Sequence, residues 1–85
     1  MNLQSGSSRE FKVALGKIFE RERKRLKLTL SDVAAVCGVR QSTISRYESG
    51  EATPGANVFL RLMLYLRLDI SELKLCLRFD RKEAT

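Results

Sequence analysis

The chain has 85 residues and a formal net charge of +6, from 16 Lys and Arg against 10 Asp and Glu. This length fits one small domain, and a hydrophobic content of 44% with a single Pro excludes collagen-like or wholly disordered material. The sequence has no His, which removes Ser-His-Asp and Cys-His catalysis and every His-containing zinc site. We therefore expect no enzyme, no metal and no cofactor.

Two helices are predicted in the first part of the chain. Ser7 and Glu10 have the spacing of a capping box, and apolar residues then recur at helical spacing: Phe11, Leu15, Ile18, Phe19 and Leu26. We expect residues 1–8 to form a flexible arm and residues 9–26 to form the first helix. A second capping box, Thr29 with Asp32, predicts a short helix over residues 30–37 that ends at Gly38.

Residues 41–49 predict a third helix with two distinct faces, ended by Gly50. Ile44, Tyr47 and the stem of Glu48 fall on its inner face. Polar side chains form a continuous stripe on the other face, which we expect to be exposed: Gln41, Ser42, Ser45, Arg46 and Ser49.

The second half of the chain is predominantly apolar. Residues 56–68 predict a fourth helix that is hydrophobic nearly all round, and a second apolar face favours burial against another chain. Residues 70–79 fit a helix or a strand, and length and neighbours favour the helix. The expected homodimer interface consists of Leu64, Tyr65, Leu68, Leu73, Leu77 and Phe79. A thicker monomer core, or a dimer through paired strand edges, is the alternative. Residues 9–79 would thus be one domain, with residues 80–85 as a loose tail.

The positive charge is concentrated in one part of the chain. Residues 1–46 carry ten basic and four acidic side chains, whereas residues 47–85 carry six of each, so the excess is +6 in the first part and zero in the second. Such a domain can turn a positive face toward a polyanion, most often nucleic acid. A solvated helix face that binds nothing is the alternative.

Cys37 and Cys76 form no C-x-x-C motif, so buried, reduced thiols fit best and a redox sensor is the weaker reading. The longest apolar run, residues 62–66, is far shorter than the roughly 20 residues that cross a bilayer. The polar N-terminal residues lack the features of a secretory signal. The sequence predicts a cytoplasmic protein without a membrane partner.

Residues 29–50, TLSDVAAVCGVRQSTISRYESG, have small, turn and branched residues where two crossed helices need them. Ala34 must be small because the next helix crosses close to it, and Gly38 must turn the chain in the left-handed region. Ile44 fills the gap between the two helices. Together these offsets predict helix-turn-helix geometry.

Residues 41–54, QSTISRYESGEATP, are similar to the signature of the lambdoid repressor and Cro-type (XRE) helix-turn-helix family, and the resemblance covers roughly residues 11–73. It implies a compact all-α, five-helix, lambda-repressor-like domain with the helix-turn-helix at the second and third helices. Such a domain binds double-stranded DNA as a symmetric dimer, with its third helix in the major groove. By the same matching, Arg23 would form a structural ion pair with Glu48.

The sequence departs from the family at the phosphate-binding positions. Leu30 stands where the family usually has Gln, Arg40 replaces a hydroxyl cap, and Glu51 with Ala52 replaces basic residues. Anchoring would then depend on Arg40 and on a basic cluster of the first helix: Arg21, Lys24, Arg25 and Lys27. The segment TLSDVA also looks like the start of a LacI-type headpiece, but a full helix precedes it here.

Side-chain chemistry assigns the DNA contacts. Gln reads adenine, Arg reads guanine and Ser reads either base, so the candidate base contacts are Gln41, Ser42, Ser45 and Arg46. The candidate phosphate contacts are Thr29, Arg40, Thr43 and Ser49. The alternatives are helix capping by Gln41 and Ser42, and a salt bridge from Arg46 to Glu48 or Glu51.

The sequence therefore predicts a sequence-specific regulator of transcription, a repressor that binds a palindromic operator as a homodimer. The alternative is an antitoxin that masks a partner toxin through the fourth helix and the C-terminal segment, with DNA binding for autoregulation. Redox sensing and catalysis are weaker readings.

Overall fold

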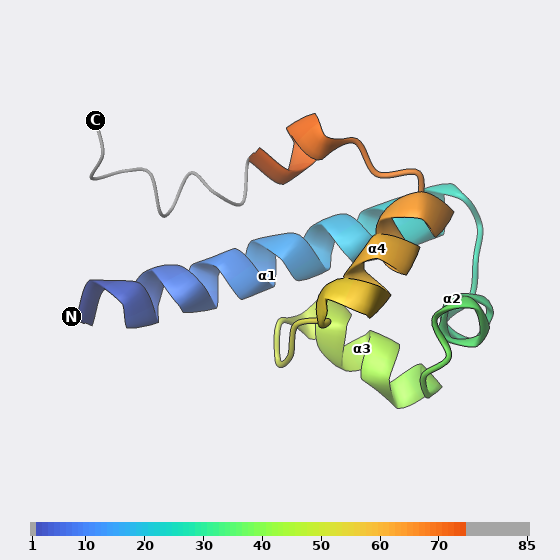
Figure 1. Cartoon of the computed structure of the whole chain (residues 1–85), viewed down its shortest axis with the longest axis horizontal. Coiled ribbons are helices and arrows are strands. Elements are labelled where there is room, and N and C mark those ends of the chain that lie inside the picture. Colours follow the sequence, from blue (N-terminus) through green and yellow to red (C-terminus); the bar gives the residue numbers. More distant parts are fainter. Residues whose placement is uncertain (1, 75–85) are drawn as a thin grey trace.

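The computed structural model of the chain describes residues 2–74, with side chains from residue 9 onward. It has four helices, α1 (Asn2–Arg25), α2 (Leu30–Cys37), α3 (Gln41–Ser49) and α4 (Ala56–Tyr65). Residues 70–74 form a further helical segment, and no strand occurs within residues 2–74. The expected all-α fold with five helical segments is therefore confirmed (Figure 1).

Two helix boundaries differ from the sequence prediction. Helix α1 begins at Asn2 instead of residue 9, so Ser7 and Glu10 lie within it and residues 2–8, expected as a flexible arm, have helical backbone. Helix α4 ends at Tyr65 instead of residue 68 because Arg67 adopts a left-handed backbone, with φ of 57°. The helix favoured for residues 70–79 is present over 70–74, and the remainder lies outside the described residues together with residues 80–85.

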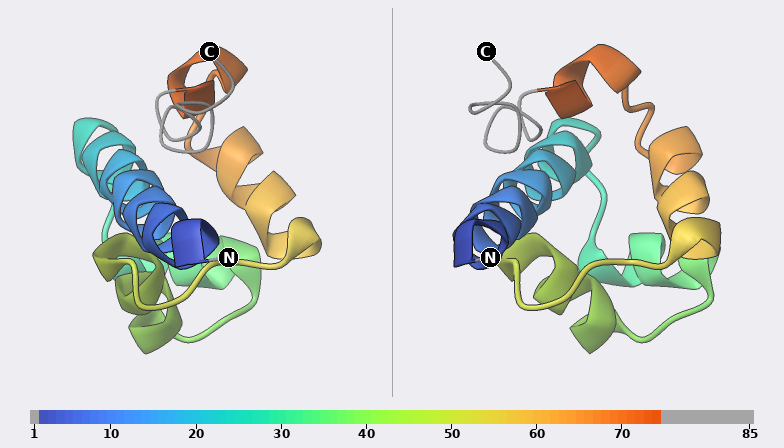
Figure 2. Two further views of the ribbon diagram at one scale, coloured as in Figure 1. Left: turned by 90° about the vertical axis from the view of Figure 1, so that its left-hand side faces the viewer. Right: turned by 60° about the vertical axis from the view of Figure 1, so that its left-hand side comes forward.

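Helix α1 is the long element against which the others are assembled. Figures 1 and 2 show α3 on one side of α1 and residues 70–74 on the other, with α4 beside them. The rings of Phe19 and Phe59 meet edge to face, with centroids 6.3 Å apart. The buried core contains residues from α1, α2, α3 and α4, and one residue that directly follows α4: Leu15, Ile18, Phe19, Val33, Ala34, Cys37, Ile44, Tyr47, Leu62 and Leu66.

The connection between α2 and α3 has the expected helix-turn-helix features. Thr29 caps α2 by accepting a hydrogen bond from the Asp32 amide, and the Asp32 carboxylate accepts one from the Thr29 amide. Gly38 ends α2 in the left-handed region at φ 71°, and Gly50 ends α3 at φ 86°. Because local signals mark these ends, the bounds of α2 and α3 match the sequence prediction.

Gly16 allows α1 and α3 to make backbone contact. A Cβ atom at this position would lie 2.5 Å from the carbonyl oxygens of both Tyr47 and Glu48, a distance that real Cβ atoms do not adopt. Side-chain patterning gave no sign of this contact, because Gly16 lies inside a regular helix. The absence of a side chain at position 16 therefore sets the distance between α1 and the end of α3.

Gly16→Ala is expected to lower the free energy of unfolding by about 1 to 3 kcal/mol, because the new methyl group meets backbone atoms that cannot rotate away. Helix propensity alone would favour Ala by about 1 kcal/mol, so the sign of the change separates the two effects. Urea unfolding monitored by circular dichroism measures it. Lys17→Ala, at an exposed neighbouring position, is the control and should change stability by less than about 0.5 kcal/mol. A stabilised Gly16→Ala protein would contradict the close contact.

Candidate nucleic-acid interface

The outer face of α3 is a polar, exposed surface. Ile44 and Tyr47 are buried beneath it, with 2% and 9% of their surfaces exposed. The residues of the stripe are all exposed: Gln41, Ser42, Ser45, Arg46 and Ser49. The two faces of α3 are thus separated as its sequence pattern indicates, and the polar face projects from the fold.

The arginine side chains at the start and on the outer face of α3 are free of hydrogen bonds and ion pairs to other described residues. Within residues 9–74, no hydrogen bond or ion pair joins the Arg46 side chain to another residue. The carboxylate of Glu48, one alternative partner for Arg46, is instead bound by Arg23. Arg40, at the N-cap of α3, makes no capping hydrogen bond with its side chain. These groups can therefore donate to a ligand without first breaking a described contact.

The hydroxyl groups proposed for phosphate contacts differ in availability. The Thr29 hydroxyl accepts from the Asp32 amide at 3.0 Å and keeps its own proton to donate. The Ser49 hydroxyl donates to the Arg46 carbonyl at 3.1 Å, so donation to a phosphate requires this bond to open. Thr43 is half-buried. Hydrogen bonds from Thr29, its backbone amide first, hold the pKa of Asp32 below its usual value and keep the cap of α2 charged.

Arg23 and Glu48 form a bidentate ion pair behind α3. The guanidinium donates from Nε to Oε2 at 2.6 Å and from Nη2 to Oε1 at 3.1 Å, and Nη1 donates to the Leu28 carbonyl at 2.9 Å. The two side chains are 12% and 10% exposed. The hydrogen bond with Glu48 raises the pKa of Arg23. The pair therefore joins the end of α1, the loop before α2 and the end of α3.

Most cations expected to anchor phosphate at the end of α1 are paired with carboxylates. Lys24 contacts Glu20 at 3.0 Å, and Arg25 contacts Glu22 at 2.6 Å. Arg21 contacts Glu22 at 3.1 Å and Glu72 at 2.6 Å. These pairs reduce the positive charge that α1 presents, so Arg40 and Arg46 are the cations closest to the outer face of α3 with no carboxylate partner within residues 9–74.

The exposed apolar surface of α4 differs in detail from the expected interface. Leu64 is 79% exposed, but Tyr65, Leu68 and Leu73 are half-buried and pack against the core. Leu60 and Ile70, which are not among the residues expected at the interface, are 60% and 65% exposed. These exposures belong to a single copy of the chain, so the dimer interface stays a prediction. Leu77 and Phe79 lie outside the described residues.

Cys37 has the environment of a structural thiol. It is 4% exposed in the core, and burial raises the pKa of its thiol. A raised pKa disfavours the reactive thiolate. Cys76 lies outside the described residues. Within the part of the chain that the structure describes, no group of three or more potential ligands could hold a metal ion, and no helix is long and apolar enough to cross a membrane.

Comparison with known proteins agrees with this geometry. A family model described as helix-turn-helix matches residues 19–73. The chain belongs to this helix-turn-helix family. The resemblance to XRE-type DNA-binding domains is thereby confirmed.

Two relatives from Methanococcus maripaludis carry the name "Putative HTH-type transcriptional regulatory protein". The protein from strain S2 is 37% identical over 51 residues, and the one from strain C5 is 33% identical over 51 residues. Each match covers 60% of this chain but only 16% of the relative. No solved structure matches the chain significantly.

Glu48→Ala in this helix-turn-helix domain is expected to lower the free energy of unfolding by about 2 to 4 kcal/mol, because it leaves the Arg23 guanidinium largely buried and unpaired. This value lies slightly below the range for fully buried pairs, since both side chains keep some exposure. Chemical denaturation measures the change. Lys24→Ala removes an exposed pair and should cost less than about 0.5 kcal/mol. Equal effects of the two substitutions would contradict a structural role for the Arg23–Glu48 pair.

Proposed function

We propose that the protein is a sequence-specific regulator of transcription that binds double-stranded DNA and acts as a repressor. The observation that carries this proposal is the exposed polar face of α3, which lies over the buried side chains of Ile44 and Tyr47. On this face, the Arg46 side chain makes no hydrogen bond or ion pair with residues 9–74. The major groove of B-DNA admits an α-helix, and a polar helix face can hydrogen-bond to base edges there. Family membership supports DNA binding as the general activity.

Each exposed side chain of α3 has a proposed role. Arg46 donates a bidentate pair to O6 and N7 of guanine, and Gln41 pairs with adenine. Ser42 and Ser45 donate to or accept from either base. Arg40 and Thr29 bind backbone phosphates beside the groove, with Thr43 and Ser49 as secondary contacts.

We further propose that the protein binds as a homodimer through α4 and residues 70–74. Leu60, Leu64 and Ile70 expose apolar surface that a second copy would cover. A twofold axis would place the two copies of α3 about 34 Å apart, in successive major grooves. The operator is then palindromic, with about ten base pairs between half-site centres.

Repression in this proposal follows from occupancy of the operator. The protein blocks transcription in the cytoplasm, without catalysis and without a cofactor of its own. The same exposed leucines favour one alternative, an antitoxin in which α4 covers a partner toxin and DNA binding serves autoregulation.

Arg46→Ala is expected to reduce discrimination between the selected operator and a variant with one guanine changed, by about 1 to 3 kcal/mol. The operator is first selected from a random duplex pool, and affinities are then measured by fluorescence anisotropy at fixed salt. Arg40→Ala is the matched control, because loss of a phosphate contact weakens all sequences alike and lowers the slope of log K against log salt by about 0.9. An Arg46→Ala protein with unchanged discrimination would remove Arg46 from the base-reading set.

Leu64→Glu is expected to convert the homodimer into a monomer, because it places a charge in the centre of the apolar surface of α4. Sedimentation equilibrium at tens of micromolar protein measures the mass. Val13→Glu is the control, since Val13 is an exposed apolar residue of α1 beside Gly50 at the end of α3, and it should leave the dimer intact. A wild-type monomer at this concentration would contradict the dimer, and co-purification of a toxin bound to α4 would favour the antitoxin alternative.

A further inference from the structure

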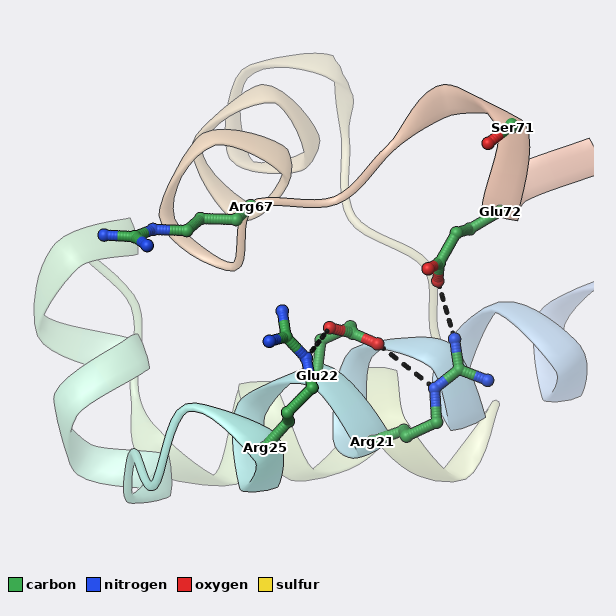
Figure 3. A pocket seen from close by; sticks show the side chains of 6 residues that line it. All are labelled: Arg21, Glu22, Arg25, Arg67, Ser71 and Glu72. Atoms are coloured by element: carbon green, nitrogen blue, oxygen red, sulfur yellow. Dashed lines mark hydrogen bonds and ion pairs between the residues drawn. The ribbon is translucent and has the colours of Figure 1, made fainter.

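A polar pocket lies between the end of α1 and the segment that follows α4. It has a volume of about 630 Å³ and is lined by Arg21, Glu22, Arg25, Arg67, Ser71 and Glu72 (Figure 3). Residues 70–74 and α3 lie on opposite sides of α1 in Figures 1 and 2. A molecule in this pocket would therefore not compete with a duplex bound to the outer face of α3.

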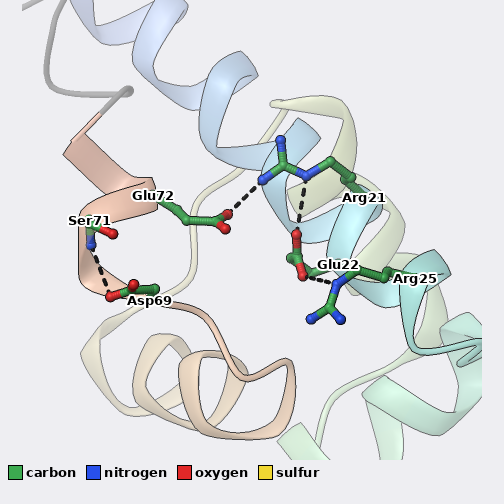
Figure 4. Close-up of polar contacts among 6 residues, drawn as sticks. All are labelled: Arg21, Glu22, Arg25, Asp69, Ser71 and Glu72. Carbon is green, nitrogen blue, oxygen red and sulfur yellow. Dashed lines mark hydrogen bonds and ion pairs between the residues drawn. The ribbon is translucent and has the colours of Figure 1, made fainter.

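The carboxylates of the pocket are already neutralised by part of its arginine side chains. Arg21 donates from Nε to Glu22 at 3.1 Å and from Nη2 to Glu72 at 2.6 Å. Arg25 donates from Nε to Glu22 at 2.6 Å (Figure 4). The hydrogen bond from Arg25 also holds the pKa of Glu22 below its usual value, so Glu22 stays ionised near neutral pH. Three guanidinium groups against two carboxylates leave the lining with a net charge of +1.

Some guanidinium N–H groups of the pocket have no hydrogen-bond partner in the described residues. Within residues 9–74, the terminal amino groups of Arg25 and the whole guanidinium of Arg67 donate no hydrogen bond. Figure 3 shows the two side chains coming from different walls, Arg25 from α1 and Arg67 from the end of α4. Ser71 lies beyond Glu72, away from both guanidinium groups, and its backbone amide donates to Asp69. Unpaired guanidinium donors therefore come from two walls of the pocket, Arg25 on α1 and Arg67 after α4.

Arg67 occupies a position where its backbone favours glycine. Its φ of 57° lies in the left-handed region, which disfavours residues with a side chain. The side chain is not needed to close α4, because the backbone amides of Arg67 and Leu68 donate to the carbonyls of Leu64 and Met63. The negative end of the α4 dipole gives a cation here a general preference, but no specific contact.

We propose that this pocket binds a small molecule that carries a phosphate group. Guanidinium groups match phosphate oxygens in geometry and charge, and two of them can satisfy several oxygens at once. The pocket is open to solvent, so a bound molecule would be held by its charged group and would not be enclosed. Both free phosphate and a phosphorylated metabolite carry the required group. This site does not depend on the proposed DNA binding.

Isothermal titration of the full chain in a phosphate-free buffer of low ionic strength tests the site. The probes are inorganic phosphate, adenosine monophosphate and adenosine. We expect saturable 1:1 binding of adenosine monophosphate, inorganic phosphate or both, and no binding of adenosine. Tighter binding of adenosine monophosphate assigns the site to a phosphorylated metabolite, whereas equal or tighter binding of inorganic phosphate assigns it to the free anion.

Arg67→Gly separates binding from folding. Glycine suits the left-handed backbone, so the variant should melt at the same or a higher temperature while its affinity for the phosphate probe falls about tenfold or more. Arg67→Gln, which keeps a long side chain, should lose affinity similarly. Lys17→Gln removes one exposed positive charge of α1 outside this pocket and should bind as the wild type. Equal losses in Arg67→Gly and Lys17→Gln, equal binding of adenosine, or no saturable binding at millimolar probe would overturn the proposal.

Discussion

The close contact between α1 and α3 is the constraint on which the rest of the molecule depends. Gly16 lets the backbone of α1 approach the last turn of α3, where any side chain at this position would meet carbonyl oxygens. The Arg23–Glu48 pair fixes the same turn from the other end of the contact and reaches the loop before α2. These contacts all involve the inner side of α3. The side chains of its outer face are therefore not needed for packing and remain available to a ligand.

The ion pairs also distinguish α1 from the outer face of α3. Carboxylates neutralise the cations at the end of α1, so the excess positive charge is not spread evenly over the surface. Cations without a carboxylate partner in the described residues include Arg40 and Arg46 at α3, and Arg67 after α4. An exposed cation therefore predicts an anion-binding surface only where no neighbouring carboxylate has already bound it.

Sequence patterns predicted the helix-turn-helix well because its signals are local. Thr29, Gly38 and Gly50 act on their own helix ends, so both bounds of α2 and the end of α3 follow from them. The start of α1 was wrong for the converse reason, since Ser7 and Glu10 have the spacing of a cap but lie inside a continuing helix. Local spacing permits a cap but does not require the chain to stop there.

Features that depend on tertiary packing could not be predicted in this way. Gly16 is recognisable as a contact only when α3 is placed across α1. Leu60 and Ile70 are exposed while Tyr65 and Leu68 are half-buried, although all four are apolar residues in or after one helix. The early end of α4 depends on Arg67 adopting a backbone conformation that the sequence rules reserve for glycine.

The most direct test of an outward-facing α3 is a backbone amide NMR titration of the full chain with its selected operator duplex. We expect the largest chemical-shift changes at residues 40–46, smaller ones at the start of α2, and little change in the buried face of α1 around Phe19. Changes concentrated on α4, with residues 40–46 unaffected, would contradict the central claim that α3 packs on the fold through its inner face and binds DNA through its outer face.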